Sequence, residues 1–405
     1  MFDHEEVHRV PSPAARAQGM RPSGTSAARA AAKPAAERGR VIDFTIGEFA
    51  LGTSDLVTDA AIAAVKGGKT RYTDTIGLPE LRLAIAEQFS RDTGQEWTAD
   101  EVAVTAGAKP GLFYLTFILL DPGDEVIIPQ PYWQTYPAQI RLGGALPVHI
   151  QHTADGQMDI GSISEAVTER TRAIIVNTPN NPTGVVYDES HLRAVAEIAI
   201  KHNLWIIFDQ CYRSFVYPPY QHHHLVSLIP EVRERTIIID SFSKTLAIAG
   251  WRVGYMLAPP NIIASVRALQ SHITSCPNVI SQYAVLEHLR SDDGQFHRWA
   301  MGQLEINREA GLGMLQRLRD VPRPHAQGGF YFYLDVRELL GRRHVARTID
   351  TVDDLAAYLI QEAGTATVSG SAFGDKHGLR IFYGVSGEDL REGLPQLVAA
   401  LNALR

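Results

Sequence analysis

Short apolar runs alternate with longer amphipathic stretches between residues 102 and 241. The runs are rich in β-branched residues, which is typical of strands buried on both faces of a sheet. They cover residues 102–105, 125–129, 173–177, 205–209 and 236–240. Segments between them, such as 189–202, are predicted to be helices. This alternation predicts an α/β fold in which helices cover both faces of a mainly parallel sheet.

The pattern changes after about residue 290, where a long helical stretch precedes two aromatic-rich runs at 330–334 and 379–383. We interpret this part as a smaller α+β domain that the N-terminal segment completes. The expected division is a large domain over 51–290 and a small domain made of 21–50 and 291–405. Residues 27–40 are rich in Ala, Arg and Lys, which favours a helix, and residues 1–20 are expected to form a flexible arm.

The composition narrows the class of protein. A chain of 405 residues with 45% hydrophobic content has enough apolar material for two domains. Its net charge of −7 argues against binding to nucleic acid or to an anionic membrane surface.

No apolar run reaches the roughly 20 residues that a membrane span needs. The acidic first residues lack the apolar core of a secretory signal. Only Cys211 and Cys276 occur, which fits a reducing compartment, so a cytoplasmic location is expected.

Polar residues gather where the predicted strands end. Thr105, Asn177, Asp209 and Asp240 each stand at the carboxyl end of an apolar run. In open α/β sheets this edge is where ligands bind. We therefore expect the functional site at this edge.

Lys244 is the centre of the candidate chemistry. It lies between hydroxyl residues in Ser241-Phe242-Ser243-Lys244-Thr245, and Arg252 follows eight positions later. A lysine amine can form a Schiff base with an aldehyde, while hydroxyls and a guanidinium can hold a phosphate. The carboxylate of Asp209 can keep a ring nitrogen protonated. Together these residues predict pyridoxal 5′-phosphate as the cofactor.

Other segments near this edge allow two interpretations each. The turn at residues 105–109 can offer free backbone amides to an anion, or it can be an ordinary strand-to-helix turn. The proline-rich loop at 177–184 is either a stiff ligand-binding loop or a rigid surface turn. Trp133 is either a stacking platform or a core residue. Arg380 lies in an apolar strand and either grips a substrate carboxylate or forms a structural ion pair.

The run His222-His223-His224 is the one feature that suggests a metal. Consecutive side chains cannot all face one ion, and no suitable partners stand at ligand spacing. We expect a solvated loop there and no metal site. Cys211 is interpreted as a small buried residue.

Taken together, the motifs resemble the aspartate aminotransferase family, class I/II enzymes with the type I fold of pyridoxal-phosphate enzymes. The resemblance spans roughly residues 21 to 400, and its order and spacing are highly specific. It is carried by the segments 21–25, 70–73, 121–125, 180–184, 241–244 and 250–254. It implies a large domain with a mainly parallel seven-stranded sheet and a homodimer whose active sites are shared between subunits.

The resemblance also implies a role for each site residue. Lys244 would be the Schiff-base lysine and proton shuttle, Asp209 would pair with the ring nitrogen, and Tyr212 would donate to the ring oxygen together with Asn181. Trp133 would stack on the ring. The phosphate would be held by Gly107, Ala108, Lys109, Ser241, Ser243 and Arg252, with Tyr72 reaching it from the neighbouring subunit. The substrate would be bound by Arg380, Asn181, Gly47, Thr25 and Lys109.

The activity implied by the resemblance is transfer of an amino group from an L-amino acid to a 2-oxo acid in a ping-pong reaction. The alternative keeps fold and cofactor but eliminates, cyclises or oxidises an amino acid. The side-chain pocket departs from the family pattern, because Gly47-Glu48 leads into Phe49-Ala50 where Pro-Asp is common. Lys109 either meets the distal carboxylate of an acidic substrate or is a surface lysine, whereas Glu48 and Asp55 favour a cationic substrate such as arginine. A ligand-sensing regulator is disfavoured by the negative net charge.

Overall fold

The computed structural model describes residues 12–37, 39–50, 52–345 and 347–405. Its centre is a sheet of seven strands in the order β2-β8-β7-β6-β5-β3-β4. All neighbouring strands are parallel except the two pairs that β8 makes, so the expected mainly parallel sheet is confirmed. The strands are β2 (Val102–Thr105), β3 (Glu125–Gln130), β4 (Leu146–Gln151), β5 (Thr171–Asn177), β6 (Trp205–Asp209), β7 (Thr236–Ser241) and β8 (Gly254–Leu257).

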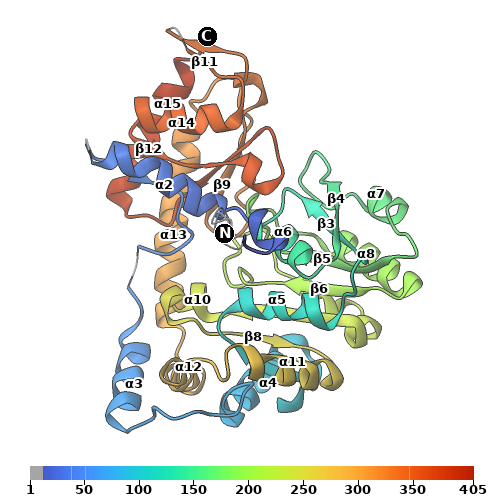
Figure 1. Ribbon diagram of the computed structural model, residues 1–405. Helices are drawn as coiled ribbons and strands as arrows, with labels where there is room; N and C mark the ends of the chain where they lie inside the picture. The colour runs from blue at the N-terminus through green and yellow to red at the C-terminus, as the bar shows by residue number, and fades with distance from the viewer. Residues whose placement is uncertain (1–11, 38, 51, 346) are drawn as a thin grey trace, which may run out of the picture.

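Both faces of this sheet are covered by helices, as Figure 1 shows. Successive strand residues point to opposite sides, so Ile237 and Ile239 pack in one core and Ile238 in another. The first core includes apolar residues of α5 (Ala108–Ile118), α6 (Thr135–Leu142) and α11 (Pro260–Ile273). The second includes residues of α4 (Pro79–Thr93), α8 (Glu189–His202) and α12 (Val279–Ser291). Burial on both faces explains why the strand sequences are continuously apolar.

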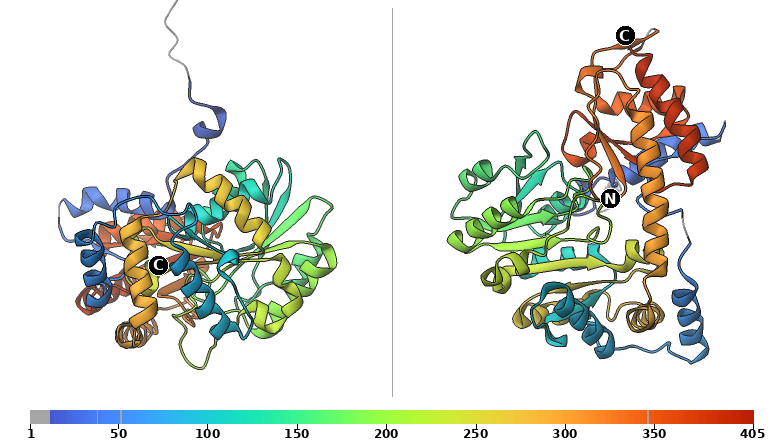
Figure 2. Two further views of the ribbon diagram at one scale, coloured as in Figure 1. Left: turned by 90° about the horizontal axis from the view of Figure 1, so that it is seen from below. Right: turned by 180° about the vertical axis from the view of Figure 1, so that it is seen from behind.

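A second, smaller sheet lies above the central one in Figure 1. Its strands β13 (Val368–Ser369), β14 (Gly378–Phe382) and β9 (Tyr331–Asp335) are antiparallel. The chain's N-terminal segment joins this region, because β1 (Ile42–Asp43) pairs with β12 (Thr365–Ala366). Helices α2 (Gly24–Ala36), α14 (Val352–Glu362) and α15 (Gly387–Asn402) surround it, and the long α13 (Gln295–Leu315) runs up to it (Figure 2).

The remaining elements complete the described chain. These are the helices α1 (Ala15–Gln18), α3 (Asp55–Lys66), α7 (Ile160–Glu165), α9 (Leu225–Leu228) and α10 (Phe242–Thr245), the hairpin of β10 (Arg343–His344) and β11 (Arg347–Thr348), and five 3₁₀ turns. Of the arm expected over 1–20, residues 1–11 lie outside the described residues. The pairing of β1 with β12 supports the expected domain division, which stays a prediction. No helix in the described ranges has the length and hydrophobicity to span a bilayer.

The register of the sheet brings the polar strand ends together. Asn177 is paired with Asp209 across β5 and β6, and Ser241 and Thr105 are both paired with Gly254 at the start of β8. Because β2, β5, β6 and β7 run in the same direction, their carboxyl ends meet at one edge. The small sheet faces this edge, and the site lies between the two.

Candidate active site

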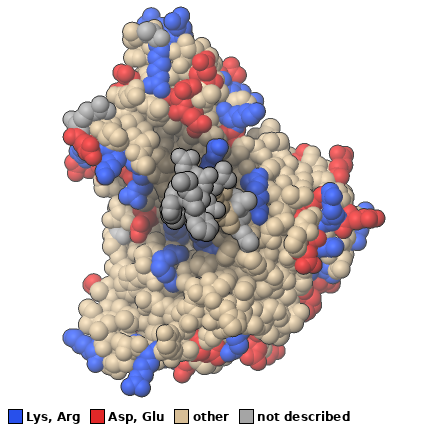
Figure 3. Space-filling model, viewed as in Figure 1, with Lys and Arg blue, Asp and Glu red and all other residues tan. Residues whose placement is uncertain are grey.

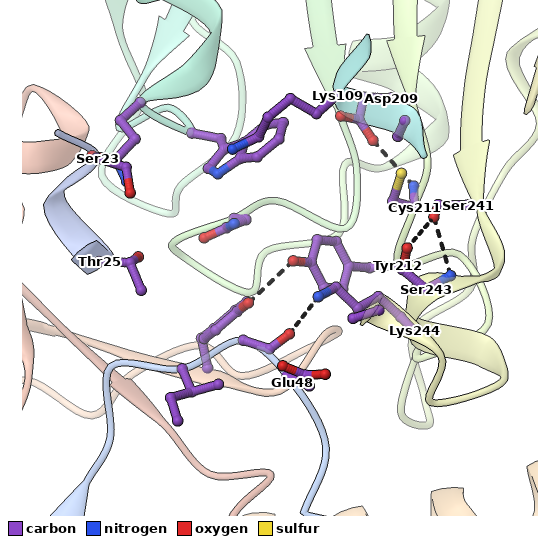
Figure 4. Close-up of a pocket in the computed structure, with 18 of the residues that line it drawn as sticks. Ser23, Thr25, Glu48, Lys109, Asp209, Cys211, Tyr212, Ser241, Ser243 and Lys244 are labelled. Atoms are coloured by element: carbon purple, nitrogen blue, oxygen red, sulfur yellow. Dashed lines mark hydrogen bonds between the residues drawn. The ribbon is translucent and has the colours of Figure 1, made fainter. Parts of the chain in front are cut away.

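A cavity of about 440 Å³ opens between the carboxyl edge of the central sheet and the small sheet. Figure 3 shows several Lys and Arg side chains near the middle of this face of the molecule. Figure 4 shows Ser23 and Thr25 of the α2 region on one side and Ser241, Ser243 and Lys244 on the other. Segments from the beginning, middle and end of the chain therefore form its walls.

Lys244 lies in the first turn of α10, directly after β7. Ser241 caps this helix, since its Oγ accepts a hydrogen bond from Ser243 N at 3.1 Å. The Lys244 Nζ donates to the carbonyl oxygen of Gly47. Burial lowers the pKa of the Lys244 amine to about 8, because the charged form loses its hydration. The neighbouring Glu48 carboxylate acts in the opposite direction. A lysine with this pKa is partly neutral near physiological pH and can act as a nucleophile.

Asp209 ends β6 at the bottom of the cavity and is 3% exposed. Its Oδ2 accepts a hydrogen bond from the Tyr136 hydroxyl at 2.7 Å, and its Oδ1 accepts one from Cys211 N at 3.1 Å. Burial raises the pKa of this carboxyl. Both of these donors are uncharged, so the site fits a cationic group, such as a protonated ring nitrogen, placed against the carboxylate.

The turn between β2 and α5 forms an anion cradle with Arg252. Gly107 precedes the helix with φ +96°, and no side chain caps the first amides of α5. A Cβ on Gly107 would meet Arg252 Nη2 at 2.5 Å, and a Cβ on Gly254 would meet Ala108 N at 2.6 Å. Uncapped helix amides beside a guanidinium fit a phosphate group. Ser241 and Ser243 line the same cavity, with their hydroxyls 2.7 Å apart.

Arg380 is buried on β14, and the N–H groups of its guanidinium are not all hydrogen-bonded within the described chain. Its Nη1 donates to Asn181 Oδ1 at 3.0 Å and its Nη2 to Thr45 O at 2.8 Å. The guanidinium lies 4.4 Å from the Tyr331 ring centroid, and its buried Nε has no hydrogen-bond partner among the described residues. No carboxylate pairs with it in the described part of the chain, which disfavours the structural ion pair and fits a substrate carboxylate.

Most of the predicted site residues line this one cavity. They are Thr25, Gly47, Ala108, Lys109, Trp133, Asn181, Asp209, Tyr212, Ser241, Ser243, Lys244, Arg252 and Arg380. Gly107 lies beside it, against Arg252. Tyr212 donates to or accepts from the Tyr331 hydroxyl at 3.1 Å. Tyr72 does not line the cavity and is 87% exposed.

Two expectations outside the central set need correction. Asp55 does not line the cavity, because it is the first residue of α3, where its charge suits a helix N-terminus. The loop expected at 222–224 is present, but it is less solvated than expected, because its three histidines are only partly exposed and the His222 and His224 rings lie edge to face with centroids 4.9 Å apart. Burial lowers the pKa of His224 to about 4. Within the described ranges, no group of three or more His, Cys, Asp or Glu is placed to hold a metal ion.

Sequence reasoning missed several residues of the cavity wall, among them Tyr136, Gln134 and Arg29. Gln134 accepts a hydrogen bond from Gly24 N through its Oε1 and so joins α2 to the loop before α6. Tyr136 and Gln134 follow Trp133 closely, and that proximity is the one signal in the sequence that points to them. Arg29 carries no comparable signal.

Comparison with known proteins agrees with this geometry. Residues 39–397 match the model of the family "Aminotransferase class I and II". A probable aspartate/prephenate aminotransferase of Aquifex aeolicus is 36% identical over 96% of this chain and 99% of its own length. The crystal structure of the aspartate aminotransferase from Rhizobium meliloti superposes with a TM-score of 0.92, at 34% identity, over 98% of this chain and 100% of that one. The aspartate aminotransferase from Thermus thermophilus with maleate gives a TM-score of 0.88, at 32% identity, over 96% and 100%.

The chain belongs to the class I and II aminotransferase family. It is an enzyme that transfers amino groups, with the type I fold of its aspartate aminotransferase relatives. These findings favour amino transfer over elimination, cyclisation or oxidation of an amino acid.

Proposed function

We propose that the cofactor is pyridoxal 5′-phosphate and that it is held in the cavity around Lys244. When bound, it supplies an aldehyde that condenses with amines and a ring that accepts electrons from the substrate's Cα. The cradle of α5 amides, Ser241, Ser243 and Arg252 binds the phosphate. Trp133 covers one face of the ring, while Asn181 and Tyr212 donate to its oxygen. The observation that carries the proposal is that Lys244 and Asp209 line one cavity with this anion cradle.

Lys244 has two tasks in this proposal. Its Nζ anchors the cofactor between reactions, and the released amine takes the proton from the Cα of the amino acid. A lowered pKa suits both tasks, because only the neutral amine can attack a carbonyl or accept a proton. Asp209 keeps the ring nitrogen protonated. The amino group leaves the donor in one half-reaction and reaches a 2-oxo acid in the next.

The preferred substrates are dicarboxylic: aspartate or glutamate as donors, with 2-oxoglutarate or another 2-oxo diacid as acceptor. Arg380 binds the α-carboxylate with Asn181. Lys109 Nζ lies 4.9 Å from the Trp133 ring centroid, and burial together with the charge of Arg252 lowers its pKa. Lys109 has no carboxylate partner among the described residues, so a second, distal carboxylate of the substrate would pair with this cation. Thr25 and the backbone of Gly47 complete the substrate contacts.

The relatives' substrates support the same choice. The similar proteins are named for aspartate or prephenate, and the Thermus thermophilus enzyme binds maleate, a dicarboxylate. A cationic substrate such as arginine loses support because Asp55 lies outside the cavity, which leaves Glu48 alone.

We further propose a homodimer in which Tyr72 reaches the phosphate of the neighbouring subunit. Exposed large apolar side chains include Ile62 and Val65 on α3, Tyr72 in the loop after it, Phe117 on α5 and Ile273 on α11. Figure 3 shows few charged side chains on the broad surface in the lower half of the view. Apolar surface of this kind is typical of a permanent interface. A cytoplasmic location is proposed as well, which the two unpaired cysteines support.

The experiment is a half-reaction with the purified protein loaded with pyridoxal phosphate. L-Aspartate is expected to convert the cofactor stoichiometrically to the pyridoxamine form with release of oxaloacetate. Ammonia release would indicate elimination, and oxygen uptake would indicate oxidation. Lys244→Ala is expected to keep the circular dichroism of the native protein and to lose turnover; retention of substantial turnover would remove Lys244 from its role.

A further inference from the structure

Tyr136 is the one side chain whose hydroxyl touches the Asp209 carboxylate in the described structure. Its hydroxyl donates to Asp209 Oδ2 at 2.7 Å across 73 positions of sequence. Both residues are 3% exposed. The other carboxylate oxygen accepts from Cys211 N at 3.1 Å. Each oxygen of Asp209 therefore has its own fixed donor, and rotation of the carboxylate would break both bonds.

We propose that Tyr136 is a positioning residue that fixes the ionised Asp209 carboxylate toward the pyridine nitrogen of the cofactor. This inference rests on the proposed function. Tyr136 acts through Asp209 and takes no part in the transfer of protons at the substrate.

The placement of Tyr136 links the acid to the aromatic wall of the cavity. Tyr136 lies in the first turn of α6, where its N donates to Trp133 O at 3.0 Å. Its ring meets the Trp133 ring edge to face, with centroids 5.5 Å apart and an angle of 87°. Tyr136 thus hydrogen-bonds to Asp209, which we propose pairs with the ring nitrogen. It also packs against Trp133, which we propose covers the face of the ring.

Electrostatics explain why Asp209 needs such a partner. Burial raises its pKa, and the negative charge of Asp240 acts in the same direction. The hydrogen bonds from Tyr136 and Cys211 oppose both effects and favour the ionised form. Asp240 is itself paired, since Arg213 Nε and the Tyr255 hydroxyl donate to it at 2.8 and 3.0 Å. Burial also raises the pKa of Tyr136 well above its usual value, so the phenol remains a donor in the neutral range.

The test is Tyr136→Phe in the full-length protein, which removes the hydroxyl and keeps the ring. Protonation of the cofactor's ring nitrogen is followed by ¹⁵N NMR of bound ¹⁵N-labelled pyridoxal phosphate as pH is raised. We expect the variant to lose this proton about one pH unit lower than the wild type, and to bind the cofactor about tenfold more weakly. An unchanged titration of the ring nitrogen would overturn the inference.

Two further variants separate positioning from a general effect on packing. Tyr114→Phe removes a buried hydroxyl that lies 3.1 Å from Thr274 Oγ1, outside the cavity, and is expected to leave the ring titration unchanged. Asp209→Asn removes the group through which Tyr136 acts, so Tyr136→Phe in that background is expected to change cofactor affinity less than twofold. Equal losses in the two backgrounds would show a purely structural role.

A side chain of nearly the same size and shape as tyrosine tests the same hydrogen bond in a protein that keeps its fold. Replacing Tyr136 with 3-fluorotyrosine keeps both the ring and the hydroxyl that donates to Asp209, so the titration of the ring nitrogen is expected to stay close to that of the wild type. A shift as large as that expected for Tyr136→Phe would contradict the proposal. Failure of the wild-type protein to bind pyridoxal phosphate would instead refute the proposed function, independently of any Tyr136 variant.

Discussion

Arg380 Nη1 donates to Asn181 Oδ1 at 3.0 Å, although 199 positions separate the two residues in the chain. Asn181 follows β5 of the central sheet, and Arg380 lies on β14 of the small sheet. The hydrogen bond therefore joins the two sheets across the cavity. A carboxylate bound by this pair would contact both sheets at once, so substrate binding and their relative placement are coupled.

Arg380→Lys is expected to raise KM for every amino donor by roughly tenfold or more, with a smaller change in kcat. The planar guanidinium offers two parallel donors to a carboxylate, and an ammonium offers a point charge. Steady-state kinetics with aspartate, glutamate and alanine measure the effect. A loss confined to acidic donors would mean that Arg380 binds the side chain of the substrate.

Lys109→Gln tests the proposed distal carboxylate site. We expect KM for aspartate and 2-oxoglutarate to rise roughly tenfold, because a charge-assisted hydrogen bond contributes about 1.5–3 kcal/mol. Alanine, which has no distal carboxylate, is expected to change less than about twofold. The backbone amide of residue 109 stays in the phosphate cradle, so cofactor affinity serves as the internal control. Equal losses for aspartate and alanine would contradict the assignment.

The lowered pKa of Lys244 predicts how cofactor uptake depends on pH. The rate at which the cofactor-free protein combines with pyridoxal phosphate is expected to rise with pH through a midpoint near 8, since burial lowers the amine's pKa from 10.5 to about 8. Glu48→Gln removes a negative charge that favours the ammonium form, so its midpoint is expected at lower pH. Stopped-flow absorbance measures both. A wild-type midpoint near 10.5 would show that the amine is not desolvated.

Tyr72→Phe tests the shared active site. Tyr72 is 87% exposed in the single chain and lines no part of its own cavity, so it can affect cofactor binding only through a second subunit. The variant is expected to bind pyridoxal phosphate several-fold more weakly, with no change in thermal stability of the cofactor-free protein. Tyr220→Phe, at a 42% exposed tyrosine, is the matched control. Sedimentation showing a monomer that binds cofactor normally would reject the shared site.

The sequence predicted the interior of the central sheet better than its edges. The expected bounds of β2, β6 and α8 agree with the structure, because these elements are buried enough for their apolar pattern to be continuous. Strands β4 and β8 were not predicted. β4 is the half-exposed edge strand and contains Pro147 and His149, while β8 has four residues and begins with Gly254. Helix α2 begins earlier than expected, at Gly24, because Ser23 caps it.

Residues of the candidate site could be predicted from the sequence only where the type of residue itself suggests a particular chemistry. Lys244, Asp209 and Arg252 were identified because an amine, an acid and a guanidinium near strand ends suggest a particular cofactor. Tyr136 was missed, because a tyrosine early in a helix has the same local pattern whether it packs in a core or reaches an acid on another strand. Its contact with Asp209 depends on how β6 and α6 lie in the folded sheet, which no local pattern encodes.

Thr25 and Arg380 approach within 3.5 Å, with 355 positions between them. Truncation from either end would therefore open the same wall of the cavity, even though the central sheet would keep all seven strands. Apolar residues of the central sheet and of the small sheet belong to one continuous core, so such a truncation would also expose part of the interior of the remaining protein. In this enzyme the two ends of the polypeptide and its middle must therefore be present together for the cavity to be complete.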